Sequence, residues 1–227
     1  MIRGLATAAL AAIIVPLVAG CSLLPGNKAT PVPSGAAPPL PAGTYTTKSF
    51  QPATTYTVPD GWTNPSDTAA YYELMPTLNQ NNGIHLFHNP QALSQAPDCP
   101  LAAEPGVGTS SLALVAWIRS LKGFSVSQPA MVAVSGLPGT YIDVGIASNW
   151  TQSCPFANGL PTVSLFYGAQ SGLRWVVAGP ERLRLYFVDV PSQGTVVVDL
   201  DSFDGTGFAN LLANATPIVK SIKFATQ

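Results

Sequence analysis

Charged side chains are scarce in this sequence: Asp, Glu, Lys and Arg together make up 9% of its 227 residues. The 10 Lys and Arg are balanced by 11 Asp and Glu, which leaves a formal net charge of -1. Nucleic-acid binding needs clustered cationic side chains that neutralise phosphates. We therefore expect no nucleic-acid partner.

Motifs of catalysis and cofactor binding are also missing. No G-x-S-x-G nucleophile elbow surrounds Ser110, Ser111 or Ser171, and only two histidines are available as a general base. The few glutamates are too scattered to nominate a carboxylate pair for sugar cleavage. Neither a glycine-rich phosphate loop nor a dinucleotide fingerprint occurs. We therefore expect a protein that is not an enzyme and has no cofactor, with a hydrolase as the alternative.

The two histidines form an H-x-x-H pair, His85 and His88. Both lie on or beside an expected strand, where an odd spacing directs side chains to opposite faces of the sheet. A shared metal ion is therefore not expected, and the default for both is a surface or loop-lining histidine.

Asp199, Asp201 and Asp204 precede Gly205, a spacing that invites a calcium interpretation. A calcium loop of the EF-hand type needs oxygen ligands at its odd positions and a distal glutamate. Phe203 occupies one of those positions and no glutamate follows. The pattern favours Asp199 and Asp201 on the outward face of a strand and Asp204 as a helix cap, with no metal site.

Apolar residues are abundant, at 47% of the chain, which excludes a wholly disordered polypeptide. They begin at the N-terminus, where Arg3 precedes an apolar run over residues 5–18. The run is shorter than the roughly 20 residues that a membrane-spanning helix needs, and small residues follow it. Residues 1–20 are therefore predicted to be a secretory signal peptide.

The string Val18-Ala19-Gly20-Cys21 resembles the bacterial lipobox. The resemblance implies cleavage before Cys21 and attachment of a diacylglyceryl group and a further acyl chain, such as palmitate, to that residue. Two or more acyl chains make a stable anchor. This predicts a lipoprotein on the extracytoplasmic face of the cell membrane, and a plain secretory signal is the alternative.

Two further cysteines, Cys99 and Cys154, both precede proline in loop-like segments. A pair of cysteines in an exported chain favours a disulfide, since the compartment is oxidising. Two free thiols are the alternative.

The 22 prolines of the chain are unevenly distributed along it. The segment after Cys21 is rich in Pro, Gly, Ala, Thr and Ser, a composition that favours extended structure and cannot bury a core. We therefore expect a lipidated cysteine and a stalk over residues 21–49, followed by a single globular domain over residues 50–227.

Within that domain, alternating apolar residues and Gly-containing turns predict about eight strands connected as hairpins. A helix is expected between a cap at Thr109 or Ser110 and Gly123, and a second helix after Asp204, which Pro217 should kink or end early. These elements predict an α+β fold in which a mainly antiparallel sheet packs with two helices.

The order of these elements, with Val58-Pro59-Asp60-Gly61-Trp62 early and Ile218-Val219-Lys220-Ser221-Ile222-Lys223-Phe224 at the end, resembles the PsbP-like sandwich. It also resembles the LpqN/LpqT-type lipoproteins of actinobacteria. The resemblance covers about residues 50–224. It implies a binding or interaction protein and supplies no catalytic motif.

Together these features predict a lipid-anchored envelope protein that binds a lipid or another small apolar ligand, or a protein partner. The ligand is expected between the sheet and a helix, or under the cysteine loops. An envelope hydrolase and a purely structural or scaffolding protein are the alternatives.

Four residues are candidates for ligand contact. Arg182, Arg184 and Asp143 could line a polar site on one strand face, or else form part of a solvated sheet face. Trp150 lies in the loop beside Cys154, where a tryptophan is well placed to meet a ligand.

Overall fold

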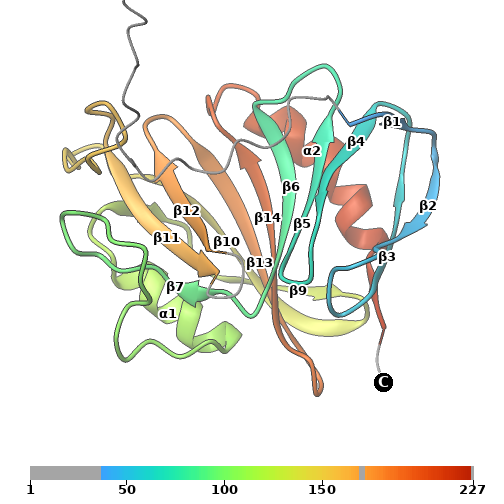
Figure 1. Ribbon diagram of the computed structural model, residues 1–227, viewed down its shortest axis with the longest axis horizontal. Helices are drawn as coiled ribbons and strands as arrows, with labels where there is room; N and C mark the ends of the chain where they lie inside the picture. The colour runs from blue at the N-terminus through green and yellow to red at the C-terminus, as the bar shows by residue number, and fades with distance from the viewer. Residues whose placement is uncertain (1–36, 169–171, 226–227) are drawn as a thin grey trace, which may run out of the picture. The chain divides into compact units, whose positions relative to one another are not determined.

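The computed structural model describes residues 37–168 and 172–225, which all belong to one compact unit (Figure 1). The predicted signal peptide, Cys21 and the first part of the predicted stalk lie outside the described residues, as does Ser171. Within the described ranges, no helix has the length and apolar character needed to cross a membrane.

A nine-stranded sheet forms the centre of the unit, and every strand pairing in it is antiparallel. This confirms the predicted α+β class with a large antiparallel sheet and two helices. In spatial order its strands are β1 (Pro39–Leu40), β4 (Trp62–Asp67), β5 (Tyr71–Pro76), β6 (Asn82–His88), β14 (Gly194–Ser202), β13 (Arg182–Val190), β10 (Leu137–Ile146) and β8 (Phe124–Val126), with β9 (Ala130–Val134) paired to β10.

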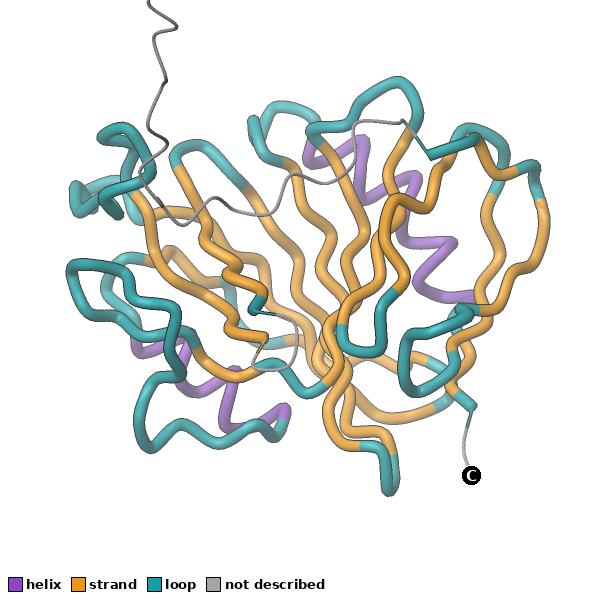
Figure 2. The backbone as a smooth tube through the Cα atoms, viewed as in Figure 1, coloured by secondary structure: helices purple, strands orange, loops and turns teal. Residues whose placement is uncertain are grey.

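Two three-stranded sheets accompany the central sheet. One consists of β12 (Leu173–Ala178), β11 (Thr162–Gly168) and β7 (Gln91–Ala92), and the other of β15 (Lys223–Phe224), β3 (Thr54–Val58) and β2 (Gly43–Thr46). The helices are α1 (Ser111–Ser120) and α2 (Phe208–Ser221), drawn in purple at opposite ends of the molecule in Figure 2.

The central sheet is covered on both faces, so it separates two hydrophobic cores. Along β13, Leu183, Leu185 and Phe187 belong to a core with α1 and β11, which we call the α1-side core. The alternating residues Tyr186 and Val188 belong to a core with α2 and β3, the α2-side core. Because side chains alternate along a strand, the buried apolar residues of β13 serve both cores.

The first helix begins as predicted. The Ser110 side chain accepts a hydrogen bond from the Ala113 N–H at 3.3 Å. Gly123 has a different role from the expected stop signal, because α1 already ends at Ser120. A Cβ at position 123 would lie 2.4 Å from Val163 Cγ2, so glycine is required for close packing of this turn against β11.

The second helix departs from prediction at both ends. Asp204 does not cap it: Gly207 holds the cap position, and the Asp204 carboxylate instead accepts a hydrogen bond from the Thr206 N–H at 3.0 Å. Pro217 lies inside the helix, which continues to Ser221. Burial of Leu211, Ala215, Ile218 and Val219 against the α2-side core outweighs the hydrogen bond that proline removes.

The predicted stalk is too long at its C-terminal end. Strands β1 and β2 lie within residues 21–49, and β2 pairs with β3 in register. Tyr45 stacks on Tyr56, and the hydroxyls of Thr46 and Thr55 are 2.8 Å apart across the strands. These Thr and Tyr residues suit a strand, so the folded part includes residues 39–46.

Candidate functional site

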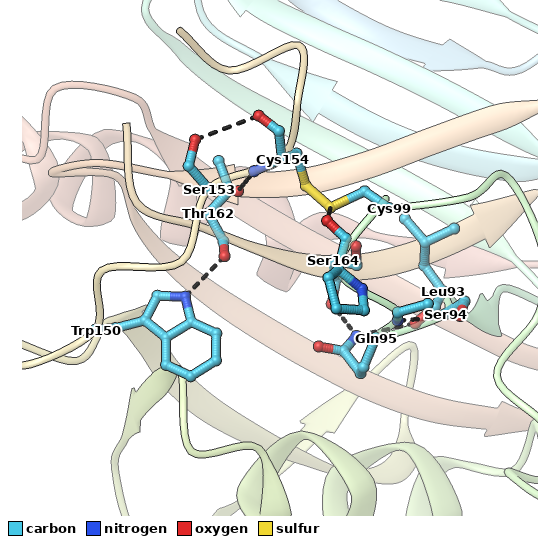
Figure 3. Close-up of a disulfide and its surroundings, with 11 residues drawn as sticks. Leu93, Ser94, Gln95, Cys99, Trp150, Ser153, Cys154, Thr162 and Ser164 are labelled. Atoms are coloured by element: carbon cyan, nitrogen blue, oxygen red, sulfur yellow. Dashed lines mark hydrogen bonds between the residues drawn. A yellow bond between two sulfur atoms is a disulfide. The ribbon is translucent and has the colours of Figure 1, made fainter. Parts of the chain in front are cut away.

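The structure joins Cys99 to Cys154 in a disulfide that fastens two loops beside β11 (Figure 3). The Trp150 indole N–H donates to the Thr162 carbonyl oxygen at 2.8 Å, and Thr162 Oγ1 accepts from the Cys154 N–H at 2.6 Å. A pocket of about 300 Å³ lies between these loops, with Trp150 in its lining. Trp150 is thus held by a backbone contact, and its predicted role in ligand binding stays a prediction.

Asp143 and Arg184 face each other across β10 and β13. The guanidinium donates to both carboxylate oxygens, at 2.6 and 2.8 Å, and lies 4.5 Å from the centre of the Tyr141 ring. The hydrogen bond to Asp143 raises the pKa of Arg184. Both side chains are partly exposed, and each satisfies the charge of the other, which is the arrangement of an ordinary sheet-face ion pair.

The other two predicted contact residues are not gathered into one site with this pair. The Arg182 guanidinium lies 5.6 Å from the centre of the Phe208 ring, beside the start of α2. Trp150 packs against the α1-side core, whereas Tyr141, next to the ion pair, packs against the α2-side core. The central sheet therefore separates Trp150 from the Asp143–Arg184 pair.

An apolar groove of about 340 Å³ runs along α1, between this helix and the β9–β10 hairpin. Phe187 of β13 contributes to its lining together with Ala116 of α1. Leu112 and Met131 also line it, and these large apolar side chains are 80% and 79% exposed. Exposed apolar side chains gathered around a concavity mark a binding surface more often than scattered ones do. We call this feature the α1 groove.

The two ends of the α1 groove differ in charge. At the start of α1, Asp189 accepts hydrogen bonds from Thr195 Oγ1 at 2.6 Å, Ser111 Oγ at 2.9 Å and the Ser111 N–H at 3.0 Å. Partial burial raises the pKa of Asp189, but these donors outweigh it and the net pKa is lowered. Arg119 lies at the other end of the groove, eight residues beyond Ser111 along α1, a rise of about 12 Å.

Arg119 is exposed, and its guanidinium donates a 3.5 Å hydrogen bond to Gln128 Oε1. None of the ion pairs among the described residues involves Arg119. The α1 groove thus has a cation at one end that is free to pair with an anionic group.

A second polar site lies between the central sheet and β12, and it corrects two predictions. Asp199 and Asp201 were expected on an outward face, but their exposures are 0% and 9%. His85, expected at the surface or in a loop, is 4% exposed, and its ring centre lies 4.6 Å from that of Trp175 on β12. The three-stranded sheet that contains β12 covers this face of the central sheet. The alternation of residues along one strand does not show which of its faces is covered.

Two glutamates complete this group, which we call the acid cluster: Glu73, Glu181, Asp199, Asp201 and His85. His85 Nδ1 lies 3.7 Å from Glu73 Oε1, and Nε2 lies 3.9 Å from Asp201 Oδ2. Glu181 is buried beside Asp201 and accepts the Ala178 N–H at 2.7 Å.

Burial dominates the electrostatics of the acid cluster. Desolvation, reinforced by the neighbouring carboxylates, raises the pKa of Glu181 to about 9 and the pKa of Asp199 well above its usual value. Desolvation raises the pKa of Asp201 to about 7 and lowers the pKa of His85 to about 3. The imidazole is therefore neutral at physiological pH, Glu181 keeps its proton, and Asp201 is only partly ionised.

His85 and His88 do lie on opposite faces of β6, as the odd spacing predicts. His88 Nε2 is 2.7 Å from the Gln193 carbonyl oxygen, and the ring packs near Phe50 of the α2-side core. In the part of the chain that the structure describes, the histidine side chains bond to Tyr71, Asn89 and the Gln193 carbonyl oxygen, and to no serine. The histidines of the described chain thus form no serine–histidine pair of the kind a hydrolase triad needs.

Sequence reasoning missed the acid cluster because its glutamates seemed too far apart. A hairpin with its turn near Asn79 pairs residue 73 with residue 85, and the structure has this register. The antiparallel pairing of β6 with β14 likewise places His85 opposite Asp199. Strand pairing, rather than spacing along the chain, was the available signal.

No protein-family model matches the chain, and no curated protein matches it. Solved structures of several other proteins are similar to it. A crystal structure of LpqN, described as involved in cell envelope biogenesis of Mycobacterium tuberculosis, has 16% identity and a TM-score of 0.41, over 83% of this chain and 90% of LpqN.

The solution structure of cyanobacterial PsbP from Synechocystis sp. PCC 6803 has 7% identity and a TM-score of 0.41, over 81% of this chain and 94% of that one. A Bacteroides thetaiotaomicron VPI-5482 crystal structure has 6% identity and a TM-score of 0.37, over 77% of this chain and 46% of that one. This chain thus spans less than half of the Bacteroides protein. Membership of the LpqN/LpqT-type lipoproteins stays a prediction.

Proposed function

We propose that the protein is an exported, lipid-anchored binding protein of the cell envelope whose α1 groove holds an anionic amphiphile. The observation that carries the proposal is the groove itself, with exposed apolar side chains along α1 and an unpaired arginine at one end. The acyl chain of the ligand would lie along Leu112 and Met131, and its anionic head would meet Arg119.

Apolar burial supplies the driving force for such a ligand. Covering exposed apolar surface stabilises a complex by about 25 cal/mol per Å² before the costs of association. The described cores are filled by packed side chains, so the ligand is expected at this open groove rather than in a hollow interior. The head group adds a charge-assisted hydrogen bond, which orients the ligand.

The lipid anchor rests on the lipobox-like string that ends at Cys21, outside the described residues. An anchored protein would meet membrane amphiphiles at high local concentration, which fits a groove for that class of ligand. A protein partner docking on the same apolar surface is the competing function.

The first test is mass spectrometry of lipid extracts from the full-length protein purified after export. We expect an acidic amphiphile at near-stoichiometric amount. Ala116→Trp should empty the groove, because Ala116 lines it and its exposed position tolerates a larger side chain. Ala213→Trp, at an exposed position of α2, is the matched control and should keep the ligand.

Arg119→Gln should weaken binding of a fluorescent long-chain fatty acid by about three- to tenfold, while a neutral fatty alcohol is unaffected. Clean extracts, together with no fatty-acid binding by the wild type, would rule out the ligand. Crosslinking of a protein at position 112 in cells would then favour the scaffolding alternative.

The anchor is tested separately with Cys21→Ala. We expect this variant to leave the membrane fraction or to remain as unprocessed precursor, because the acylated side chain is gone. An unchanged mass and unchanged membrane partitioning would refute lipidation.

A further inference from the structure

A separate cavity lies beside the acid cluster, at the opposite end of β13 and β14 from the α1 groove. It has a volume of about 320 Å³ and is bordered by the turn between β5 and β6 and by the end of β14. Ser202 of β14 pairs with Asn82 of β6, so these two segments meet at the same edge of the sheet, the upper edge in Figure 1. We call it the turn cavity.

Two residues in the wall of the turn cavity each carry a buried oxygen atom that lacks a partner. Asp201 Oδ1 and Asn82 Oδ1 have no hydrogen bond among the described residues, and both residues are more than nine-tenths buried. A buried acceptor without a donor costs about 1–3 kcal/mol. Because both residues belong to the cavity wall, a ligand that carries donors is a candidate partner for these atoms.

The ring of His85 offers a third acceptor in one of its two tautomers. His85 Nδ1 lies 2.8 Å from the Tyr71 hydroxyl oxygen. In the tautomer that donates from Nδ1 to this oxygen, Nε2 carries no proton and accepts. The ring lies directly over Gly83, where a Cβ would be 2.5 Å from Nε2, so glycine is needed for the ring to take this position.

The charged groups around the site are carboxyl groups. Asp201 faces Glu181 and Asp199, with Glu73 behind His85, and no described Lys or Arg contributes to the pKa shifts of these carboxyl groups. A carboxyl group in such surroundings keeps its proton unless a cation enters. The turn cavity therefore matches a positively charged group that also donates hydrogen bonds.

The walls favour an organic cation over a metal ion. Met75 and the half-exposed Phe203 give the turn cavity apolar surface and an aromatic face, which suit the carbon atoms and charge of an amine. Among the described residues, no group of three His, Cys, Asp or Glu side chains has an arrangement that would hold a metal. A cavity of this volume is also much larger than a bare ion needs.

We propose that the turn cavity binds the primary ammonium group of a small organic amine. The three N–H donors of the ammonium meet Asp201 Oδ1, Asn82 Oδ1 and His85 Nε2, and its carbon chain lies against Met75 and Phe203. This site is independent of the α1 groove, and the proposal does not rest on the lipid ligand.

Isothermal titration of the exported protein with n-butylammonium at pH 6, where Asp201 is mostly protonated, tests the proposal. We expect saturable binding with release of a proton, because a cation beside Asp201 stabilises its ionised form. Comparing buffers of different ionisation enthalpy measures that proton. Tetramethylammonium, which has the charge but no N–H, and n-butanol, which has no charge, should each bind at least tenfold more weakly.

Asp201→Asn should weaken n-butylammonium binding at least tenfold and abolish proton release. Phe203→Ala, at a half-exposed position that should not disturb folding, should weaken binding about threefold. Asp98→Asn, the same change at an exposed aspartate in the Cys99 loop, is the matched control and should bind as the wild type does. No saturable binding by the folded wild type, or equal affinity of Asp201→Asn and Asp98→Asn, would overturn the proposal.

Discussion

The two faces of β14 bury side chains of opposite character. Toward α2, the strand presents Val196, Val198 and Leu200, all fully buried in the α2-side core. Toward β12, it presents Val197 followed by Asp199 and Asp201, buried almost as completely. The two faces are therefore similarly buried but differ in chemistry. Apolar packing stabilises one face. The other face buries carboxyl groups, so its contribution to the free energy of unfolding depends on their protonation.

The largest effect is expected from removing the disulfide, which restrains only the α1-side face. Replacing Cys99 and Cys154 by serine releases a link between residues 55 apart in sequence, worth about 4 kcal/mol of unfolding free energy in the chain-entropy model. Hydrogen exchange should show lost protection in β11 and the two cysteine loops. Equal loss of protection in α2 and β3 would mean that the two faces of the sheet unfold together and differ only in their side-chain chemistry.

The next effect is a pH dependence that belongs to the acid cluster. The folded-state pKa values of about 7 for Asp201 and about 9 for Glu181 exceed the unfolded values near 4, so the folded state holds more protons. Each of these groups should lower the free energy of unfolding by about 1.4 kcal/mol per pH unit between its unfolded and folded pKa values, so the fall from pH 5 to pH 9 should be several kcal/mol. His85 acts in the opposite sense: its folded pKa of about 3 removes stability as the pH falls below about 6.5.

Urea unfolding at pH 5, 7 and 9 measures the slope of the free energy of unfolding against pH. Asp199→Asn combined with Asp201→Asn should flatten it, because two of the ionising groups are gone. Leu200→Ala, on the other face of the same strand, is the control: it should cost about 3 kcal/mol at every pH and keep the wild-type slope. Stability that rises between pH 5 and pH 9 in the wild type would contradict this account of the acid cluster.

The smallest effect is expected at the partly exposed Asp143–Arg184 pair, on the α2 side. Asp143→Asn should cost less than about 1 kcal/mol, and the difference from the wild type should shrink in 1 M salt, because solvent and ions screen this pair. Thermal unfolding in low and high salt measures both quantities. A loss above 2 kcal/mol that is insensitive to salt would show that the pair supports packing on that face.

Local signals in the sequence were enough for much of the fold. Ser110 caps α1, and the hairpins form an antiparallel sheet. Each of these features depends on residues close in sequence or on a period of two along a strand. The pairing of Cys99 with Cys154 was predicted because they are the two cysteines that follow Cys21 in a chain expected to be exported.

The acid cluster was beyond such signals because its burial depends on what covers the strand. The pattern of Asp199 and Asp201 is that of an exposed strand face, and only the packing of β12, with Trp175, makes it an interior one. The strands at residues 39–46 were missed for a related reason: their proline-rich surroundings suggested a stalk, and their partners β3 and β4 come later in the chain.

The short strand β1 has a mechanical consequence. Only Pro39 and Leu40 pair with β4, at the outer edge of the central sheet, and this is where the described chain begins. Tension applied to the chain before residue 37 would load these few hydrogen bonds first, ahead of the long pairing between β13 and β14. The edge strand would separate from β4 and lengthen the extended chain by a few residues, while the buried side chains of both cores stay packed.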